Sequence, residues 1–112
     1  MSVKEITSKA DFDALISSTP FVALETYGVW SAYCKAISPY FAKQADDFAV
    51  PEKFVFARFD KEEVPDLANE LVISSMPVFI FFENGEKVKT LNGANTSSLK
   101  FAIRDMSSKA KA

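Results

Sequence analysis

Short apolar runs alternate with amphipathic stretches along the whole of this 112-residue chain. The runs at 21–24, 54–59 and 78–82 have the length and the aromatic and β-branched content of buried strands. The stretches at 9–18 and 31–48 place apolar residues at helical spacing. Alternating strands and helices predict an α/β fold, in which helices cover both faces of a central sheet.

Local signals refine this pattern. Pro39 interrupts the second helical stretch by removing one backbone donor, and Asn84-Gly85 is a turn signal between two strands. The remaining predicted elements are a strand at 3–6, a helix at 65–71, a hairpin strand at 87–91 and a last helix that starts at 96 or 97. The sequence therefore predicts a mixed sheet of about five strands with about four helices.

Length and composition predict one globular domain over residues 1–106, followed by a polar tail at 107–112 that we expect to fray. Hydrophobic residues make up 48% of the chain and charged residues 25%, as in globular proteins. The eleven phenylalanines are expected to fill the core and not to line a cofactor site.

The charge pattern and the missing residue types exclude several functions. A net charge of −2 without a basic stripe argues against nucleic acid as a partner. The N-terminus lacks the apolar region of a signal peptide and no run is long enough for a membrane span, so we expect a cytoplasmic monomer. Cys34 is the only cysteine and histidine is absent, which excludes an intrachain disulfide and histidine-dependent catalysis. No metal or cofactor is expected.

One segment, Trp30-Ser31-Ala32-Tyr33-Cys34-Lys35, follows a predicted strand and resembles the Trp-Cys-Gly-Pro-Cys-Lys active site of thioredoxins. Other matches extend the resemblance over nearly the whole chain. They are Cys34 to Pro39, which resembles the start of the active-site helix, Met76-Pro77 at the family's cis-proline, the hairpin at 82–86, and Gly93 beside the active-site groove. This similarity to the thioredoxin family implies the thioredoxin fold.

The chain also departs from the family pattern. Ser31 stands where the family has its attacking cysteine, and Ala32-Tyr33 replaces Gly-Pro. Glu25 stands in place of a buried aspartate, and Arg58 stands where a lysine often lies beside it. Thioredoxin chemistry needs two thiols at i, i+3 spacing, one to attack a disulfide and one to release the mixed disulfide. The same motif that indicates the family therefore argues against its usual reaction.

Ser31 and Cys34 each have a structural and a chemical interpretation. Serine is a preferred N-cap, and its hydroxyl would need an activating base to act as a nucleophile, so we expect Ser31 to cap the helix. Free cysteines behave as small buried hydrophobes, and we expect Cys34 to be inert. The alternative is that Cys34 forms a mixed disulfide, for example with glutathione.

Glu25 interrupts an apolar strand. The resemblance implies that it exchanges protons with Cys34 as a general acid or base. The alternative, which the sequence favours, is an ion pair with Arg58 on the adjacent strand that offsets the desolvation of both charges.

The resemblance also implies a groove in which an extended peptide pairs with the backbone before Pro77. The groove residues would be Trp30, Ala32, Tyr33, Met76, Pro77, Gly93 and Ala94, with Lys35, Pro39 and Arg58 in support. Pro77 has the alternative of a role in folding only.

Two functions remain. The first is a thioredoxin-type protein of the thiol–disulfide oxidoreductase family, redox-impaired because the attacking cysteine is missing. The second is a non-catalytic binding module that uses the groove. Whether the chain is an enzyme stays open. The expected partners are proteins, including disulfide-containing substrates, with a thioredoxin reductase as one candidate.

Overall fold

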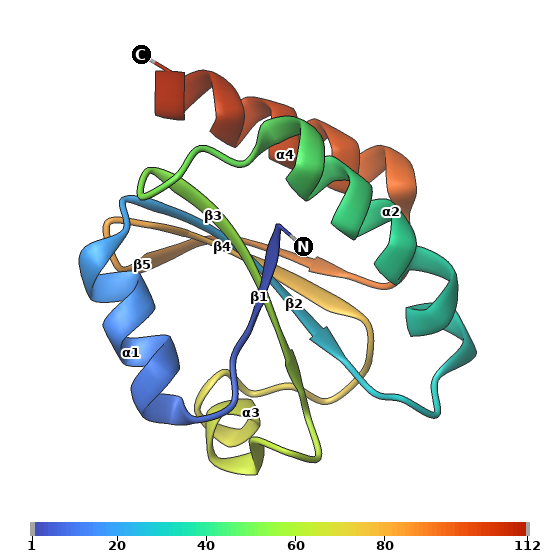
Figure 1. Cartoon of the computed structure of the whole chain (residues 1–112). Helices are drawn as coiled ribbons and strands as arrows, with labels where there is room; N and C mark the ends of the chain where they lie inside the picture. The colour runs from blue at the N-terminus through green and yellow to red at the C-terminus, as the bar shows by residue number, and fades with distance from the viewer. Residues whose placement is uncertain (1, 112) are drawn as a thin grey trace.

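The computed structural model describes residues 2–111, which form a three-layer α/β fold with a sheet between two pairs of helices (Figure 1). In chain order the elements are β1 (Val3–Glu5), α1 (Lys9–Ser18), β2 (Phe21–Tyr27), α2 (Ala32–Phe48), β3 (Phe54–Asp60), α3 (Pro65–Glu70), β4 (Val78–Glu83), β5 (Glu86–Asn92) and α4 (Thr96–Lys111). No helix within residues 2–111 combines the length and the apolar content needed to cross a lipid bilayer.

The five strands lie in the order β1-β3-β2-β4-β5. The pairs β1–β3 and β3–β2 are parallel, whereas β4 runs antiparallel to β2 and β5 runs antiparallel to β4. The predicted α/β fold with a mixed sheet and four helices is confirmed. Because β2 and β3 are parallel, their carboxyl ends meet at one edge of the sheet, where the loop that contains Trp30 begins.

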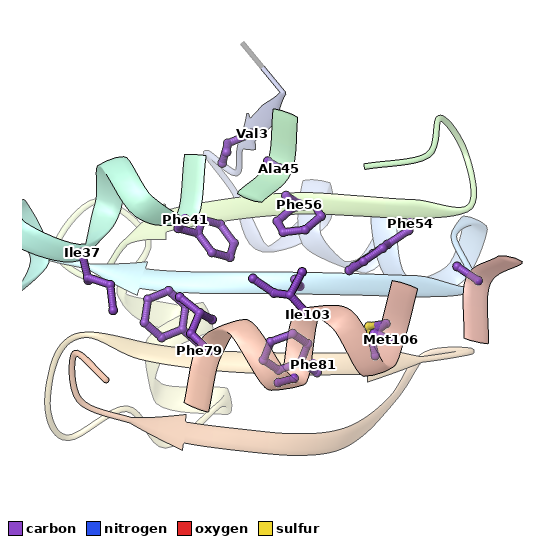
Figure 2. Close-up of a cluster of buried hydrophobic side chains, with 14 residues drawn as sticks. Val3, Ile37, Phe41, Ala45, Phe54, Phe56, Phe79, Phe81, Ile103 and Met106 are labelled. Atoms are coloured by element: carbon purple, nitrogen blue, oxygen red, sulfur yellow. The ribbon is translucent and has the colours of Figure 1, made fainter. Parts of the chain in front are cut away.

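Two apolar clusters hold the layers together. Between the sheet and the α2–α4 pair, Phe41 of α2 lies 5.3 Å, centroid to centroid, from both Phe56 and Phe79 on the strands (Figure 2). Between the sheet and the α1–α3 pair, Phe12 packs on Phe82 at 5.3 Å. Most of the phenylalanines are core residues, as predicted, but Phe101 is an exception on the outside of α4.

The β4–β5 hairpin turns where the sequence predicts. Asn84 and Gly85 have φ angles of 52° and 83°, so both adopt the left-handed conformation that asparagine and glycine tolerate best. The turn therefore follows from local chemistry alone.

Two expected boundaries differ from the structure by more than one residue. β2 continues from Leu24 to Tyr27, because Glu25 and Thr26 are buried and paired on both sides in the sheet. The fraying expected after residue 106 is wrong for 107–111, which continue α4. Ser107 and Ala110 are 3% and 4% exposed, so tertiary packing stabilises this polar segment as helix. Residue 112 lies outside the described residues.

Candidate functional site

Ser31 is the N-cap residue of α2, as the sequence predicts. It has an extended backbone, and its hydroxyl accepts a hydrogen bond from the Cys34 backbone N–H at 3.3 Å. The Ser31 carbonyl also accepts from the Lys35 N–H at 3.1 Å, which starts the helix. The Ser31 residue is 6% exposed. Its hydroxyl therefore satisfies an otherwise free donor at the helix terminus.

Cys34 lies in the first turn of α2 and faces the protein interior, with 2% of its surface exposed. Cys34 is one of the residues around a shallow hollow of about 310 Å³ beside the motif. The hollow is lined by Tyr27, Gly28, Val29, Cys34, Lys35, Ser38 and Arg58. Cys34 thus lies beside the α2 N-terminus with little access to solvent.

Glu25 lies on β2, in the strand that precedes the motif, and is 1% exposed. Ser38 Oγ donates a hydrogen bond of 2.5 Å to Glu25 Oε2. Burial raises the pKa of Glu25 above its ordinary value, because desolvation penalises the carboxylate, while the Ser38 bond and the Arg58 charge oppose that rise. The carboxyl can therefore hold a proton at a higher pH than an exposed glutamate.

The sequence favours an ion pair between Glu25 and Arg58, but in the structure Arg58 pairs with Glu5. Arg58 Nε donates to Glu5 Oε1 at 2.7 Å, and Tyr27 Oη donates to Glu5 Oε2 at 2.8 Å. The guanidinium also lies 4.7 Å from the centre of the Tyr27 ring. In the sheet, Arg58 is level with Glu5 on one side and Glu25 on the other. It pairs with the half-exposed partner, where desolvation costs less.

Four of the residues expected to line a groove come together in two groups. A Cβ at Gly28 would lie 2.8 Å from Met76 Cε and 3.2 Å from Trp30 Nε1, so both side chains pack over this glycine. On the other side, the Gly93 N–H donates to the Pro77 carbonyl at 2.9 Å, and the Met76–Pro77 peptide bond is cis.

The expected groove residues differ in exposure. Trp30 and Tyr33 are 65% and 72% exposed, whereas Pro77 is buried. Ala32, Gly93 and Ala94 are also exposed. Two aromatic side chains therefore face solvent next to the motif, as binding surfaces often have.

The sequence did not predict two polar contacts of the site. Trp30 Nε1 donates to Glu62 Oε1 at 2.6 Å, which joins the motif loop to the segment after β3. Ser38, which bonds Glu25, stands one helical turn after Cys34. Residues four apart share a helix face, so the sequence could have placed Ser38 on the same face of α2 as Cys34. No sequence pattern connects Glu62 with Trp30.

Comparison with known proteins agrees with this geometry. The family model for thioredoxin matches residues 3–105. Thioredoxin-like protein 1 of Schizosaccharomyces pombe is 42% identical over 110 residues, which cover 98% of this chain and 38% of that protein. The thioredoxin of Neurospora crassa is 35% identical over 114 residues, covering 97% of this chain and 90% of the relative. A solved structure of Plasmodium falciparum thioredoxin superposes with a TM-score of 0.86 at 36% identity, covering 92% of this chain and 98% of that one.

The fold and the motif at the start of α2 define the class as thioredoxin-fold proteins. The match over residues 3–105 is decisive, and the chain belongs to the thioredoxin family. It spans little more than a third of the length of its fission yeast relative, but nearly all of the Neurospora protein.

Proposed function

We propose that this chain is a thioredoxin-type protein whose modified site has lost dithiol turnover. The proposal rests on one observation: the residue at the attacking position, Ser31, is the buried N-cap of α2 and bonds the Cys34 backbone. A cysteine at this position would be acidified by the helix terminus, but a serine hydroxyl is far less acidic. Activation of the hydroxyl would need a base, and the chain has no histidine.

Disulfide reduction by thioredoxins takes two thiol–disulfide exchange steps, and each step needs its own thiol. A first thiolate attacks a substrate disulfide, forms a mixed disulfide and expels one substrate thiolate. A second thiol then attacks the mixed disulfide, releases the other substrate thiolate and leaves an internal disulfide. Cys34 could complete only the first half, and it is 2% exposed. Turnover would then depend on an external thiol.

Reduction of insulin disulfides, followed by the turbidity of the released chains, tests the proposal. The parent protein should stay at the background rate with dithiol as electron donor, and so should Ser31→Ala. Ser31→Cys should gain activity, with a new thiol pKa below the ordinary value of about 8.5 and an internal disulfide to Cys34. Multiple turnovers by the parent protein above background would contradict the loss of turnover.

A second candidate function is a binding module that uses the groove without turnover. It is favoured by the exposure of Trp30 and Tyr33 and by the packing of Met76 with Trp30 over Gly28. Tyr33 adds an aromatic surface where the family has proline. An extended protein segment could add its backbone beside Met76–Pro77. If Ser31→Cys forms the internal disulfide yet reduces no insulin, the binding module is the better reading.

The partners under either function are proteins, with disulfide-containing proteins first. A thioredoxin reductase is a candidate partner that the Ser31→Cys variant can test, because only an internal disulfide gives the reductase a substrate. Oxidised Ser31→Cys should then be reduced by a thioredoxin reductase with its nicotinamide donor, and failure would remove the reductase as a partner. A cytoplasmic setting, in which thiols stay reduced, agrees with a single unpaired cysteine.

A further inference from the structure

The outer face of α4 combines exposed aromatic surface with positive charge, away from the motif. Ile103 and Met106 point from α4 into the core (Figure 2), so residues 100, 101 and 104 lie on the opposite, solvent face of the helix. The C-terminal part of α4 lies across the molecule from the loop between β2 and α2 (Figure 1). This outer face begins at Ser97, three residues after the expected groove residue Ala94, and continues along α4 to Ser108.

Phe101 is the largest apolar side chain on this face and is 80% exposed. Its ring makes no contribution to either apolar cluster of the core. A shallow hollow of about 490 Å³ follows the helix beside it. The lining residues are Ser97, Lys100, Phe101, Arg104, Asp105 and Ser108. An apolar side chain from a partner could therefore contact the Phe101 ring within a polar rim.

Lys100 and Arg104 flank Phe101 at i, i+4 spacing, where two like charges repel. Within residues 2–111, the basic partners of ion pairs are Lys9, Lys43, Arg58 and Lys109. Neither cation is stabilised by its helix, so their placement favours an anionic partner.

The net charge of the whole chain, −2, differs in sign from the charge of α4. α4 itself carries four lysines and arginines against one carboxylate, Asp105, while the rest of the chain carries nine against fourteen. The chain as a whole is therefore acidic and its last helix is basic. Charge complementarity at α4 selects a partner rich in aspartate or glutamate.

We propose that the outer face of α4 docks an acidic protein segment. In this complex, carboxylates of the segment pair with Lys100 and Arg104, and an apolar side chain between them packs on Phe101. Nucleic acid fits less well, because two neighbouring cations neutralise few phosphates and the chain is acidic overall. A membrane fits less well, because the face offers a single apolar anchor.

The test is a titration of the ¹⁵N-labelled full chain with a short peptide of glutamates around a central pair of leucines. Backbone shifts should concentrate at residues 97–108. A peptide of the same length made of glutamate alone should bind about tenfold more weakly, because it lacks the apolar anchor. Raising the salt from about 0.01 M to about 1 M, which shortens the screening length from about 30 to about 3 Å, should weaken both.

Matched variants separate the two components of the surface. Phe101→Ala should remove the preference for the leucine peptide, whereas Val72→Ala, at another exposed apolar residue, should not. Lys100→Glu with Arg104→Glu should weaken binding at least about tenfold, whereas Lys4→Glu with Lys61→Glu changes the charge equally and should not. Lys100→Glu alone should raise the unfolding temperature while it weakens binding, which excludes unfolding as the cause.

Three outcomes would overturn the proposal. They are shifts that avoid residues 97–108, equal binding of the two peptides, and tighter binding of a single-stranded DNA oligonucleotide or of phosphatidylserine vesicles than of the leucine peptide.

Discussion

The candidate site has two parts that differ in how they meet solvent. The buried cluster, made of Glu25, Ser31, Cys34 and the half-buried Ser38, has its carboxylate and its capping hydroxyl bonded within the chain. The groove surface has the opposite character, since Trp30 and Tyr33 are 65% and 72% exposed. The proposed function is consistent with this contrast, since Ser31 and Cys34 are buried in the first turn of α2 whereas Trp30 and Tyr33 face solvent.

This difference predicts which substitutions change the stability of the protein and which change binding. Polar groups in the buried cluster have no water to replace a lost partner, so changes there alter the free energy of unfolding and its pH dependence. Groups on the groove surface exchange protein contacts for water at little cost, so changes there should alter binding alone.

Ser38→Ala should have the largest effect on stability. It removes the donor to the buried Glu25 carboxylate and should lower the free energy of unfolding by about 2 kcal/mol in mildly alkaline buffer. The loss should shrink in acid, where Glu25 is protonated. Urea unfolding over a range of pH measures both effects, with Ser108→Ala, an exposed serine on α4, as the control. An equal loss at every pH would show that the charge of Glu25 is not involved.

Glu25→Gln should have a smaller effect that depends on pH. Burial raises the folded-state pKa of Glu25 above 4.5, so its stabilising contribution is complete below that pH and is lost as the pH rises through the folded pKa. The variant should therefore gain stability relative to the parent in neutral buffer and lose this gain in acid. The free energy of unfolding of both proteins is measured against pH. A constant difference between them would place Glu25 in a solvated state. Glu63→Gln, at an exposed carboxylate, is the control.

Ser31→Ala should cost about 1 kcal/mol, because the Cys34 N–H loses its capping oxygen. Ser31→Asn should recover most of this stability, since asparagine is an equally good N-cap. Thermal unfolding of the three proteins measures the difference. If alanine is neutral and asparagine destabilises, the hydroxyl is not acting as a cap.

Trp30→Phe should have the smallest effect, within about 0.5 kcal/mol, although it removes the 2.6 Å bond to Glu62. The indole and its partner are both exposed, so water replaces the lost contact. Glu62→Gln, which keeps an acceptor, is the matched control. A loss as large as that of Ser38→Ala would make the Trp30–Glu62 contact structural and would end the distinction between the two parts of the site.

The parts that could be predicted from the sequence are those fixed by local chemistry. The Asn84-Gly85 turn, the Ser31 cap and the burial of the Phe41, Phe56 and Phe79 side chains all follow from residue type and spacing. The polar tail was predicted wrongly for 107–111, because the burial of Ser107 and Ala110 depends on what the helix packs against and not on its composition.

By itself, the sequence determined the order of the elements, the family motif and its single remaining thiol, because periodicity and residue identity do not depend on neighbours in space. Only the tertiary structure decided which partners the charged groups of the site take. Arg58 lies between Glu5 and Glu25 because β3 lies between β1 and β2, and it pairs with Glu5 at the half-exposed edge. Glu25 accepts a hydrogen bond from Ser38 instead, because a buried carboxylate needs a donor and α2 supplies one.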